Sequence, residues 1–397
     1  MTMQFPAPSE TFAAVEVRAL HERGIEVDVY GLRPEHPRHS AMMRERRVEH
    51  VRTRHMTILR VMRGLLDGIL APRRLLFLLT HILLRVHSTR ERLKSLVLVP
   101  IVLRIDAEVR RGRYDVVHLF WGHYPALVGA VLQHCAPSPP VSLFLGAYDL
   151  HRNYGPSALV ASTAAHVWTH AAVNLRAIEA LGIERERVRV VYRGVDLSSI
   201  DEVRRRSGCR TPGHIVTAGR LIASKGTERV LRAFALLCER APHAKLTVLG
   251  DGPDRLALEG IAAKLCLSGT VRFAGHVSHD DVIASLAGAE AFVLLSSKPD
   301  ERLPNAVKEA MACGVVCVVS RTPGIEELIE HGRSGFVVDV GDTVATAEAL
   351  ATVLAGGPQI DEIREQARRH VEQRFAASAS AMMLGDAWAT SVAERRG

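Results

Sequence analysis

Two glutamates, Glu301 and Glu309, lie eight positions apart in "ERLPNAVKE", on either side of Pro304 and Asn305. Pro304 predicts the first turn of a helix, because a proline there loses no intrahelical hydrogen bond. The backbone N–H groups of residues 305–307 would then point at the preceding loop, where a phosphate can accept them. The carboxylates would repel that phosphate, but they can accept hydrogen bonds from sugar hydroxyls. A nucleotide sugar, with a diphosphate between two sugars, satisfies both demands.

A second stretch, "TAGRLIASKGTERV" (217–230), places Gly219, Arg220 and Lys225 between a predicted strand and a predicted helix. Arginine offers a bidentate fork and lysine a point charge, which together suit a diphosphate. Gly219 lets the backbone approach a ligand closely. An isolated pair of this kind is more often solvated surface charge. Because both stretches follow strands in the same half of the chain, together they favour a diphosphate site.

The elements that must position these residues alternate between strands and helices. Nearly all-apolar strands separated by helices predict parallel sheets covered on both faces. The predicted strands are residues 25–30, 115–120, 141–145, 188–192, 214–219, 245–250, 271–275, 291–295, 315–320 and 335–340.

The alternation runs twice, which predicts two domains. We expect a first domain over 1–195, a linker over 196–213, a second domain over 214–375 and a final helix over 376–397 that crosses back to the first domain. Each domain would be a doubly wound parallel sheet, and the two would face each other across a cleft. Ligands of such sheets bind at the carboxyl ends of the strands.

The composition and net charge of the chain indicate which classes of binding partner to expect. The 397 residues are 47% hydrophobic and 24% charged, which is typical of a globular protein, and the net charge of +8 favours an anionic partner. Aromatic residues make up 5%, and no recognised nucleic-acid module accompanies the charge, so we expect no nucleic-acid partner.

The N-terminus lacks the pattern of a signal peptide, and the longest apolar run (75–84) is too short for a membrane span. These features predict a cytoplasmic protein.

Residues 36–110 interrupt the alternation, because they are helical and basic in pattern. Residues 41–60 hold six arginines against two glutamates. One interpretation is a solvated helical insert over the first sheet. The other is an amphipathic basic surface that docks on the inner face of an anionic membrane.

Four segments, "GRLIASKG", "LGDGPDRLALE", "ERLPNAVKEAMACGVVCVVS" and "TPGIEELIEHGRSGFVV", in this order and spacing resemble the donor-binding half of the retaining family 4 glycosyltransferases. Glu301 and Glu309 match the E-x7-E signature of that family. "SETFAAVEVRALHERGIEVDVYGL" and "RVVYRGVDL" resemble its N-terminal half, in the exopolysaccharide and colanic-acid-type branch. The resemblance implies the GT-B fold, in which two Rossmann-like domains face a cleft.

The resemblance also implies roles in the donor half. Arg220 and Lys225 would bind the pyrophosphate and stabilise the leaving nucleotide, Glu309 would hold the ribose, and Glu301 would bind the transferred sugar near its anomeric carbon. Gly219, the backbone of Leu303, Pro304 and Asn305, and Glu327 in "GIEEL" would complete the donor site.

Members of this family keep the anomeric configuration and need no metal or other cofactor. The resemblance therefore implies a hexose transfer from a UDP- or GDP-linked sugar to a lipid-linked glycan, a polysaccharide or a small molecule.

The first half departs from the family pattern. Relatives commonly carry H-x-H where this chain has "DVVHLFWGHYPA", so His118 is present, Phe120 replaces the second histidine and His123 is a candidate substitute. A histidine at a strand end is otherwise structural. Asp149, in "LGAYDLH", aligns with an aspartate of the matching loop, and the alternative role for it is a turn or cap.

The start of the chain also departs, because only "MTMQF" precedes the helix that Ser9 would cap. Either the true start lies upstream or the first strand is stunted. Two rival functions remain open: a sugar-nucleotide epimerase or phosphorylase on the same fold, and a non-catalytic scaffold in a polysaccharide-assembly complex.

Overall fold

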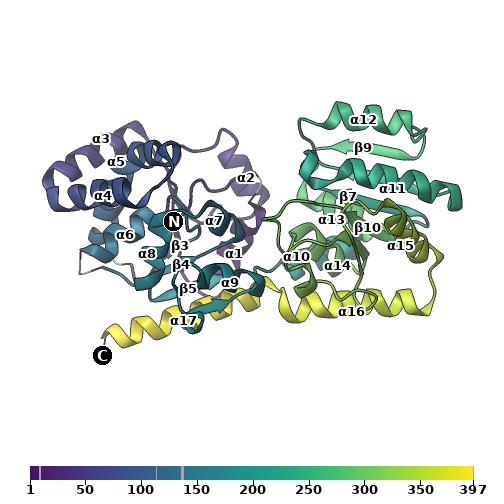
Figure 1. The fold of residues 1–397 in the computed structure, drawn as a ribbon. Helices are drawn as coiled ribbons and strands as arrows, with labels where there is room; N and C mark the ends of the chain where they lie inside the picture. The colour runs from purple at the N-terminus through teal and green to yellow at the C-terminus, as the bar shows by residue number, and fades with distance from the viewer. Residues whose placement is uncertain (9, 113, 136–137, 397) are drawn as a thin grey trace. The chain divides into compact units, whose positions relative to one another are not determined.

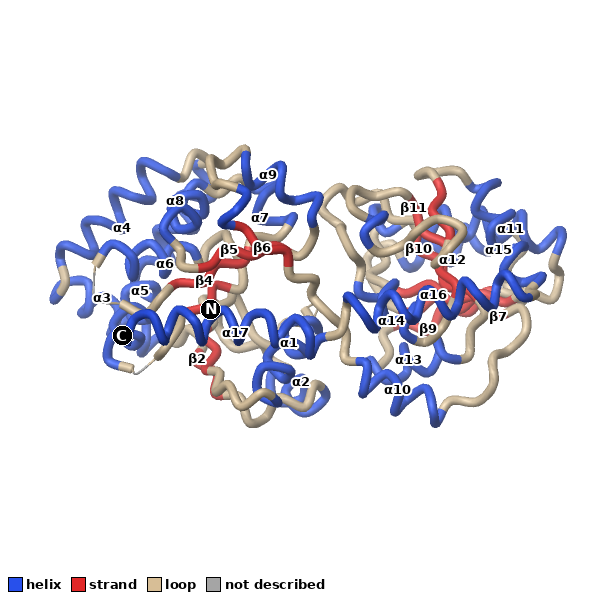
Figure 2. The backbone as a smooth tube through the Cα atoms, turned by 90° about the horizontal axis from the view of Figure 1, so that it is seen from below, coloured by secondary structure: helices blue, strands red, loops and turns tan. Residues whose placement is uncertain are grey.

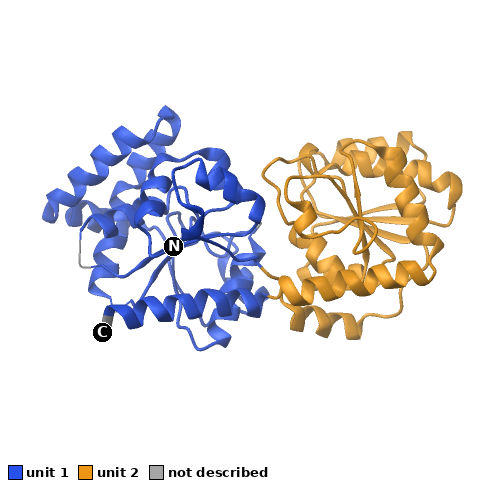
Figure 3. Cartoon of the chain, turned by 60° about the horizontal axis from the view of Figure 1, so that its bottom comes forward, with its two compact units in different colours: residues 1–193, 377–397 blue, residues 194–376 orange. Residues whose placement is uncertain are grey.

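The structure is a computed structural model of the chain, and it describes residues 1–8, 10–112, 114–135 and 138–396. These residues form two compact units (Figure 3). Unit 1 contains residues 1–193 and 377–397, and unit 2 contains residues 194–376. Each unit has its own parallel sheet and its own hydrophobic core.

Unit 1 contains two sheets, and the strands within each run parallel. Figure 2 shows strands of both sheets in red, among them β2, β4, β5 and β6. One sheet pairs β1 (Asp28–Tyr30) with β2 (Arg52–Arg54); the other has the order β3 (Val117–Leu119), β4 (Val141–Phe144), β5 (His166–Thr169), β6 (Val188–Val190). Before β1, Thr2 forms a single bridge with Gly31, and the carbonyl of Met1 accepts a hydrogen bond from the Phe120 N–H. The expected short first strand is therefore reduced to one bridge.

The helices of unit 1 cover its strands and extend beyond them (Figure 1). They are α1 (Thr11–Glu22), α2 (His39–Glu45), α3 (Ile58–Leu70), α4 (Pro72–Arg85), α5 (Thr89–Arg111), α6 (Ala126–His134), α7 (Ala147–Arg152), α8 (Gly155–Thr163), α9 (Leu175–Glu179) and α17 (Ala377–Arg396), with 3-10 turns η1 (Ala172–Asn174) and η2 (Arg185–Arg187). Ser9, the predicted cap of α1, lies outside the described residues.

Helix α17 packs on α1 and on the strands of unit 1. Leu384 and Trp388 of α17 are buried against Leu20 of α1 and Trp168 of β5. The Trp388 indole N–H also donates a 3.0 Å hydrogen bond to the Ser142 hydroxyl on β4. The last helix of the chain is thus part of the core of unit 1.

The basic segment 36–110 is largely helical, as its sequence predicts, although it also contains β2. Helix α3 approaches α5 through Gly64, where a Cβ atom would collide with the carbonyl of Pro100. Arg60 and Arg104 lie 2.7 Å from the two carboxylate oxygens of Glu108 and reinforce the contact. Since glycine faces α5, the large aliphatic residues of α3 point away from it.

Unit 2 is one six-stranded parallel sheet with the order β12-β11-β10-β7-β8-β9. The strands are β7 (His214–Ala218), β8 (Lys245–Leu249), β9 (Val271–Gly275), β10 (Ala291–Leu294), β11 (Val316–Ser320) and β12 (Phe336–Val338). The chain proceeds outward from β7 to β9 and then returns to place β10 on the other side of β7. This is the doubly wound order, and its switch point lies between β7 and β10.

The helices of unit 2 pack as neighbours on the faces of this sheet. Helix α11 packs on α12 and α15, and α14 packs on α13 and α16. The bounds are α10 (Leu197–Arg206), α11 (Thr227–Arg240), α12 (Arg255–Lys264), α13 (His279–Ala287), α14 (Asn305–Ala312), α15 (Thr343–Ala355) and α16 (Pro358–Arg374), with turns η3 (Ala223–Lys225) and η4 (Ile325–Glu327).

The predicted linker 196–213 is wrong over most of its length, because α10 occupies residues 197–206. The Asp196 carboxylate caps this helix by accepting a 3.0 Å hydrogen bond from the Ser199 N–H. Ile200 and Val203 are buried, and α10 packs on α13 inside unit 2. The segment is polar and rich in arginine, so its sequence did not indicate that two buried residues hold this helix against unit 2.

Candidate functional site

The loops after β7 and β10 lie side by side at the switch point of the unit 2 sheet. Both strands are parallel and hydrogen-bonded to each other, so their carboxyl ends share one edge. Gly219 and Arg220 follow β7 directly, and Glu301 lies in the loop that follows β10. The sheet therefore brings together the two stretches that the sequence singled out.

Lys225 and Glu301 form an ion pair between these loops. Their side chains are largely buried, and the second carboxylate oxygen of Glu301, Oε2, is buried without a hydrogen-bond partner among the described residues. Lys225 is expected to bind a diphosphate and Glu301 a sugar. In the structure the two groups pair with each other.

Arg220 is exposed, and the described part of the chain gives its side chain no ion pair or hydrogen bond. Between Lys225 and α11, Gly226 adopts a φ of +76°, and a Cβ atom there would collide with the carbonyl oxygen of Leu295. A glycine is thus required where the β7 loop touches the end of β10. This close contact fixes the loop that carries both cations.

Helix α14 begins as predicted beside Glu301, with one difference at its first turn. Pro304 occupies the N-cap position rather than the first helical position, and its carbonyl accepts hydrogen bonds from the N–H groups of Val307 (3.1 Å) and Lys308 (3.3 Å). The expectation that the Val307 N–H is free is therefore wrong. Leu303 is buried, and the Asn305 amide oxygen accepts from the Lys308 ammonium at 3.1 Å.

Glu309 lies one turn into α14, and its carboxylate meets a group that the sequence did not reveal. His279 Nε2, from the first residue of α13, lies 3.0 Å from Glu309 Oε1. The His279 side chain is 43% exposed, whereas that of Glu309 is 12% exposed. A signal was available, because "GHVSHDDV" follows a strand, but its pairing depends on the packing of α13 against α14.

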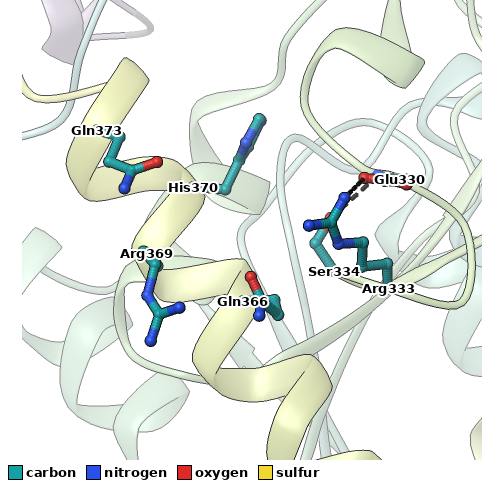
Figure 4. A pocket seen from close by; sticks show the side chains of 7 residues that line it. All are labelled: Glu330, Arg333, Ser334, Gln366, Arg369, His370 and Gln373. Carbon is teal, nitrogen blue, oxygen red and sulfur yellow. Dashed lines mark hydrogen bonds and ion pairs between the residues drawn. The ribbon is translucent and has the colours of Figure 1, made fainter.

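Glu327 ends the short turn η4, away from the Lys225–Glu301 pair in sequence. Its backbone carbonyl accepts a 3.2 Å hydrogen bond from His370 of α16. His370 also lines a polar pocket with Arg369, Glu330 and Arg333, and the last two form a 3.0 Å ion pair (Figure 4). None of the predicted site residues, Glu327 included, lines this pocket.

In unit 1, His123 and Asp149 come together at the carboxyl end of the β3-β4 pair. One oxygen of the buried Asp149 carboxylate accepts hydrogen bonds from the His123 backbone N–H (3.0 Å) and lies 2.7 Å from His123 Nδ1. Its other oxygen accepts from the Gly146 N–H at 2.9 Å. Asp149 therefore combines the cap role with an acid–histidine pair.

His118 takes a different position, inside the packing of unit 1. Its Nδ1 lies 2.9 Å from the Ser142 hydroxyl, and its ring centroid lies 5.2 Å from that of Trp388. Burial lowers the pKa of His118 well below its ordinary value, and nearby cationic groups including Arg193 lower it further. This environment is that of a neutral structural histidine.

Phe120, which replaces the expected second histidine, supports a buried arginine. The Arg193 guanidinium lies 3.9 Å from the Phe120 ring centroid and 3.8 Å from that of Phe144. Its Nε lies 3.5 Å from the buried Glu16 carboxylate, and burial raises the pKa of Glu16. This cation between two aromatic rings could not be inferred from the sequence, because Arg193 and Phe120 are 73 positions apart.

The whole chain is similar in fold to solved glycosyltransferases. It aligns with HepE from Anabaena, in a complex with UDP and glucose, at a TM-score of 0.70 and 18% identity, over 97% of each chain. It also aligns with a sucrose-phosphate synthase from Thermosynechococcus elongatus at a TM-score of 0.70 and 19% identity, over 96% of this chain and 92% of the other. The fold is therefore GT-B, as the sequence resemblance implies.

Most of the sequence of unit 2 matches a known family model. Residues 199–370 match the family model of the glycosyl transferases group 1 and form a domain of that family. A GDP-mannose-dependent alpha-(1-6)-phosphatidylinositol dimannoside mannosyltransferase from Mycobacterium tuberculosis is 35% identical over 51% of this chain and 53% of its own length. A putative colanic acid biosynthesis glycosyltransferase, WcaL from Escherichia coli, is 31% identical over 50% of each chain. The chain thus spans about half the length of these curated relatives.

Proposed function

We propose that this protein is a retaining, metal-independent glycosyltransferase. It would move a hexose from a UDP- or GDP-linked sugar to a lipid-linked glycan, a polysaccharide or a small-molecule acceptor. The observation that carries this proposal is the pair of carboxylates around the start of α14, each beside a basic group: Glu301 with Lys225, and Glu309 with His279. The HepE complex contains UDP and glucose, and the mycobacterial relative is named GDP-mannose-dependent, which supports both donor classes.

In the proposed reaction the bond between the anomeric carbon and the diphosphate breaks, and negative charge develops on the leaving oxygen. Arg220 and Lys225 stabilise this charge in the transition state, which lowers the activation free energy of the transfer. Glu309 accepts hydrogen bonds from the ribose hydroxyls, and Oε2 of Glu301 accepts from a hydroxyl of the transferred sugar. The acceptor hydroxyl attacks from the face that the diphosphate leaves, and the leaving phosphate takes its proton. Neither glutamate acts as a nucleophile, in contrast to the retaining glycoside hydrolases.

We place the acceptor at a membrane surface because the insert exposes an unusual number of aliphatic side chains. Monomeric soluble proteins rarely expose large contiguous apolar patches. The large apolar residues exposed on α3 are Ile58, Leu59, Met62, Leu65, Leu66, Ile69 and Leu70, joined by Leu76, Leu83 and Leu84 of α4 and Leu93 and Val97 of α5.

Cationic side chains accompany this aliphatic surface. Arg63, Arg73, Arg85, Arg90 and Lys94 are exposed on the same three helices. Each such charge contributes about 1 kcal/mol of attraction to an anionic leaflet. None of the described helices is long and apolar enough to span a bilayer. The surface therefore favours interfacial docking over the alternative of a merely solvated insert.

The donor site is tested by a thermal-shift panel of UDP, GDP, ADP, dTDP and their hexose conjugates. One nucleotide class at about 100 times its Kd should stabilise the protein by about 2.7 kcal/mol. Arg220→Ala should abolish this shift, whereas Arg232→Ala, which removes an exposed arginine paired with Glu228 on α11, should retain it. A shift that is equal in both variants would contradict the assigned site.

Turnover separates the proposal from its rivals. A transferase needs both donor and acceptor to form a glycoside, an epimerase converts the donor alone, and a scaffold binds the nucleotide without turnover.

Membrane docking is tested by sedimentation with phosphatidylcholine vesicles, with and without phosphatidylglycerol. Leu66→Asp with Ile69→Asp should abolish binding to the anionic vesicles, and Leu256→Asp, at an 82% exposed position of α12, should not.

A further inference from the structure

Three side chains with metal-ligand chemistry meet in unit 1, and the proposed transfer uses none of them. Glu35 lies in the loop after β1, His39 is the first residue of α2, and His55 follows the last residue of β2. Their ligand atoms all lie within 4.8 Å of one another.

The local fold explains why these three residues meet. β1, α2 and β2 form a βαβ unit in which Tyr30 pairs with Arg54 in a parallel register. The carboxyl ends of parallel strands share one edge, so Gly31 and His55, the next residues of the two strands, lie beside each other. A Cβ atom on Gly31 would lie 2.6 Å from His55 Nδ1, so the glycine leaves the space that the imidazole fills.

The two imidazoles are buried with almost no hydrogen-bond partners. His39 and His55 are 8% and 6% exposed. His39 Nδ1 and both ring nitrogens of His55 are buried and lack a partner among the described residues. His39 Nε2 lies 3.4 Å from the Thr53 hydroxyl, which is long for a hydrogen bond. Leaving a buried polar group unsatisfied costs about 1–3 kcal/mol, so this cluster lacks something that would complete it.

Two backbone carbonyl groups, those of Phe5 and Arg33, lie near the His55 ring, although neither forms a hydrogen bond with it in the structure. A histidine that binds a metal usually donates its second N–H to a carboxylate or a backbone carbonyl. These carbonyl groups are available as acceptors for the His55 ring nitrogen that would not face the ion.

We propose that Glu35, His39 and His55 bind a zinc ion. Two imidazoles and one carboxylate form a common three-residue zinc set, which leaves a fourth position for water. Magnesium and calcium prefer all-oxygen sites, so the two histidines select against them. The ion would tie the loop after β1 to the end of β2 and stabilise unit 1. It takes no part in the transfer, which we propose as metal-independent.

The test is a zinc titration of the full chain after treatment with a chelator, followed by calorimetry. Tryptophan fluorescence adds a specific readout, because Trp121, Trp168 and Trp388 all lie in unit 1. We expect one zinc ion per chain, a rise in the unfolding temperature of unit 1, and visible absorption bands of a tetrahedral site when cobalt replaces zinc.

Variants decide which residues bind the ion. Glu35 is exposed, so Glu35→Gln should fold normally and weaken zinc binding by at least about tenfold, the lower end of what even outer-shell changes cause. His39→Gln and His55→Gln should abolish the cobalt bands. His36→Gln is the matched control, because His36 lies outside the cluster and accepts a 3.1 Å hydrogen bond from the Arg38 N–H. The proposal is wrong if wild-type protein binds no zinc, or if Glu35→Gln and His39→Gln bind it as tightly as His36→Gln does.

Discussion

Lys225 and Glu301 form an ion pair across 76 residues of sequence, between the loops that follow two adjacent strands of unit 2. One carboxylate oxygen of Glu301 remains buried without a partner among the described residues. The pair therefore holds each group in place and leaves Oε2 of Glu301 as an acceptor, which we propose to bind a sugar hydroxyl.

This pairing predicts that the two residues act as a unit in turnover. Lys225→Met should lower kcat/KM by about 10²–10³, the usual cost of losing one group that stabilises transition-state charge. Glu301→Gln should lower it to a similar extent, because it weakens both the proposed sugar contact and the ion pair that positions Lys225. The double variant should lose far less than the product of the two effects, because either change already disrupts the pair. Steady-state kinetics of the four proteins measure this coupling, and multiplicative losses would show that the residues act independently.

The Asp149–His123 pair makes a separate prediction for unit 1. Asp149→Asn replaces one of the two acceptor oxygens with an amino group, which must then face either the Gly146 N–H or the His123 N–H. It should therefore lower the free energy of unfolding of unit 1 by about 1–3 kcal/mol. It should also lower turnover while leaving the nucleotide-induced thermal shift unchanged, since the proposed donor residues belong to unit 2. Unfolding followed by tryptophan fluorescence, together with kinetics, checks both effects. A lost nucleotide shift would contradict this division of roles.

Alanine substitutions at Gly226 and Gly260 should change the free energy of unfolding of unit 2 in opposite directions. Gly226→Ala places a methyl group against the Leu295 carbonyl at a φ of +76°, so it should destabilise unit 2 by more than about 1 kcal/mol. Gly260→Ala, in the exposed middle of α12 with no atom within 4 Å of the new Cβ, should stabilise by about 0.5–1 kcal/mol. Urea unfolding followed by circular dichroism compares the two. Equal effects would show that the β7 loop relaxes around the new methyl group.

The apolar strands were predictable from the sequence, and the two missed strands show where the pattern ends. β2 reads "RTR" and has no apolar residue, and β5 reads "HVWT", with two apolar residues between polar ones. Both are strands because a neighbour of the right register pairs with them, β1 in one case and β4 and β6 in the other. Pairing of this kind depends on the whole sheet, so the residues of the strand itself do not reveal it.

The candidate site could likewise be predicted only in part from the sequence. Glu301, Glu309, Arg220 and Lys225 could be selected by residue type and by their places after strands. The partners could not, since the Lys225–Glu301 pair depends on the order that puts β10 beside β7, and the His279–Glu309 pair depends on the packing of α13 on α14. His118 likewise becomes a structural residue only because α17 brings Trp388 onto its ring.

His118 predicts how the stability of unit 1 depends on pH. Its pKa lies well below 6.5 in the folded protein, chiefly because of burial, whereas the unfolded chain takes up a proton near 6.5. The neutral ring is therefore compatible with folding above pH 6.5, and stability falls as the pH drops below it, by up to about 1.4 kcal/mol per pH unit.

His118→Gln should reduce this slope without abolishing it, because burial also lowers the pKa values of four other histidines of unit 1, His50, His55, His81 and His166. Glu16, 4.0 Å from His118, acts in the opposite direction, because its raised pKa lets the folded state take up a proton in acid; it does so in both proteins, so their difference isolates the histidine. Urea unfolding between about pH 5.5 and 7.5, around the ordinary pKa of histidine, measures that difference through the three tryptophans of unit 1. Parallel pH profiles for the two proteins would show that His118 is protonated in the folded state as readily as in the unfolded chain.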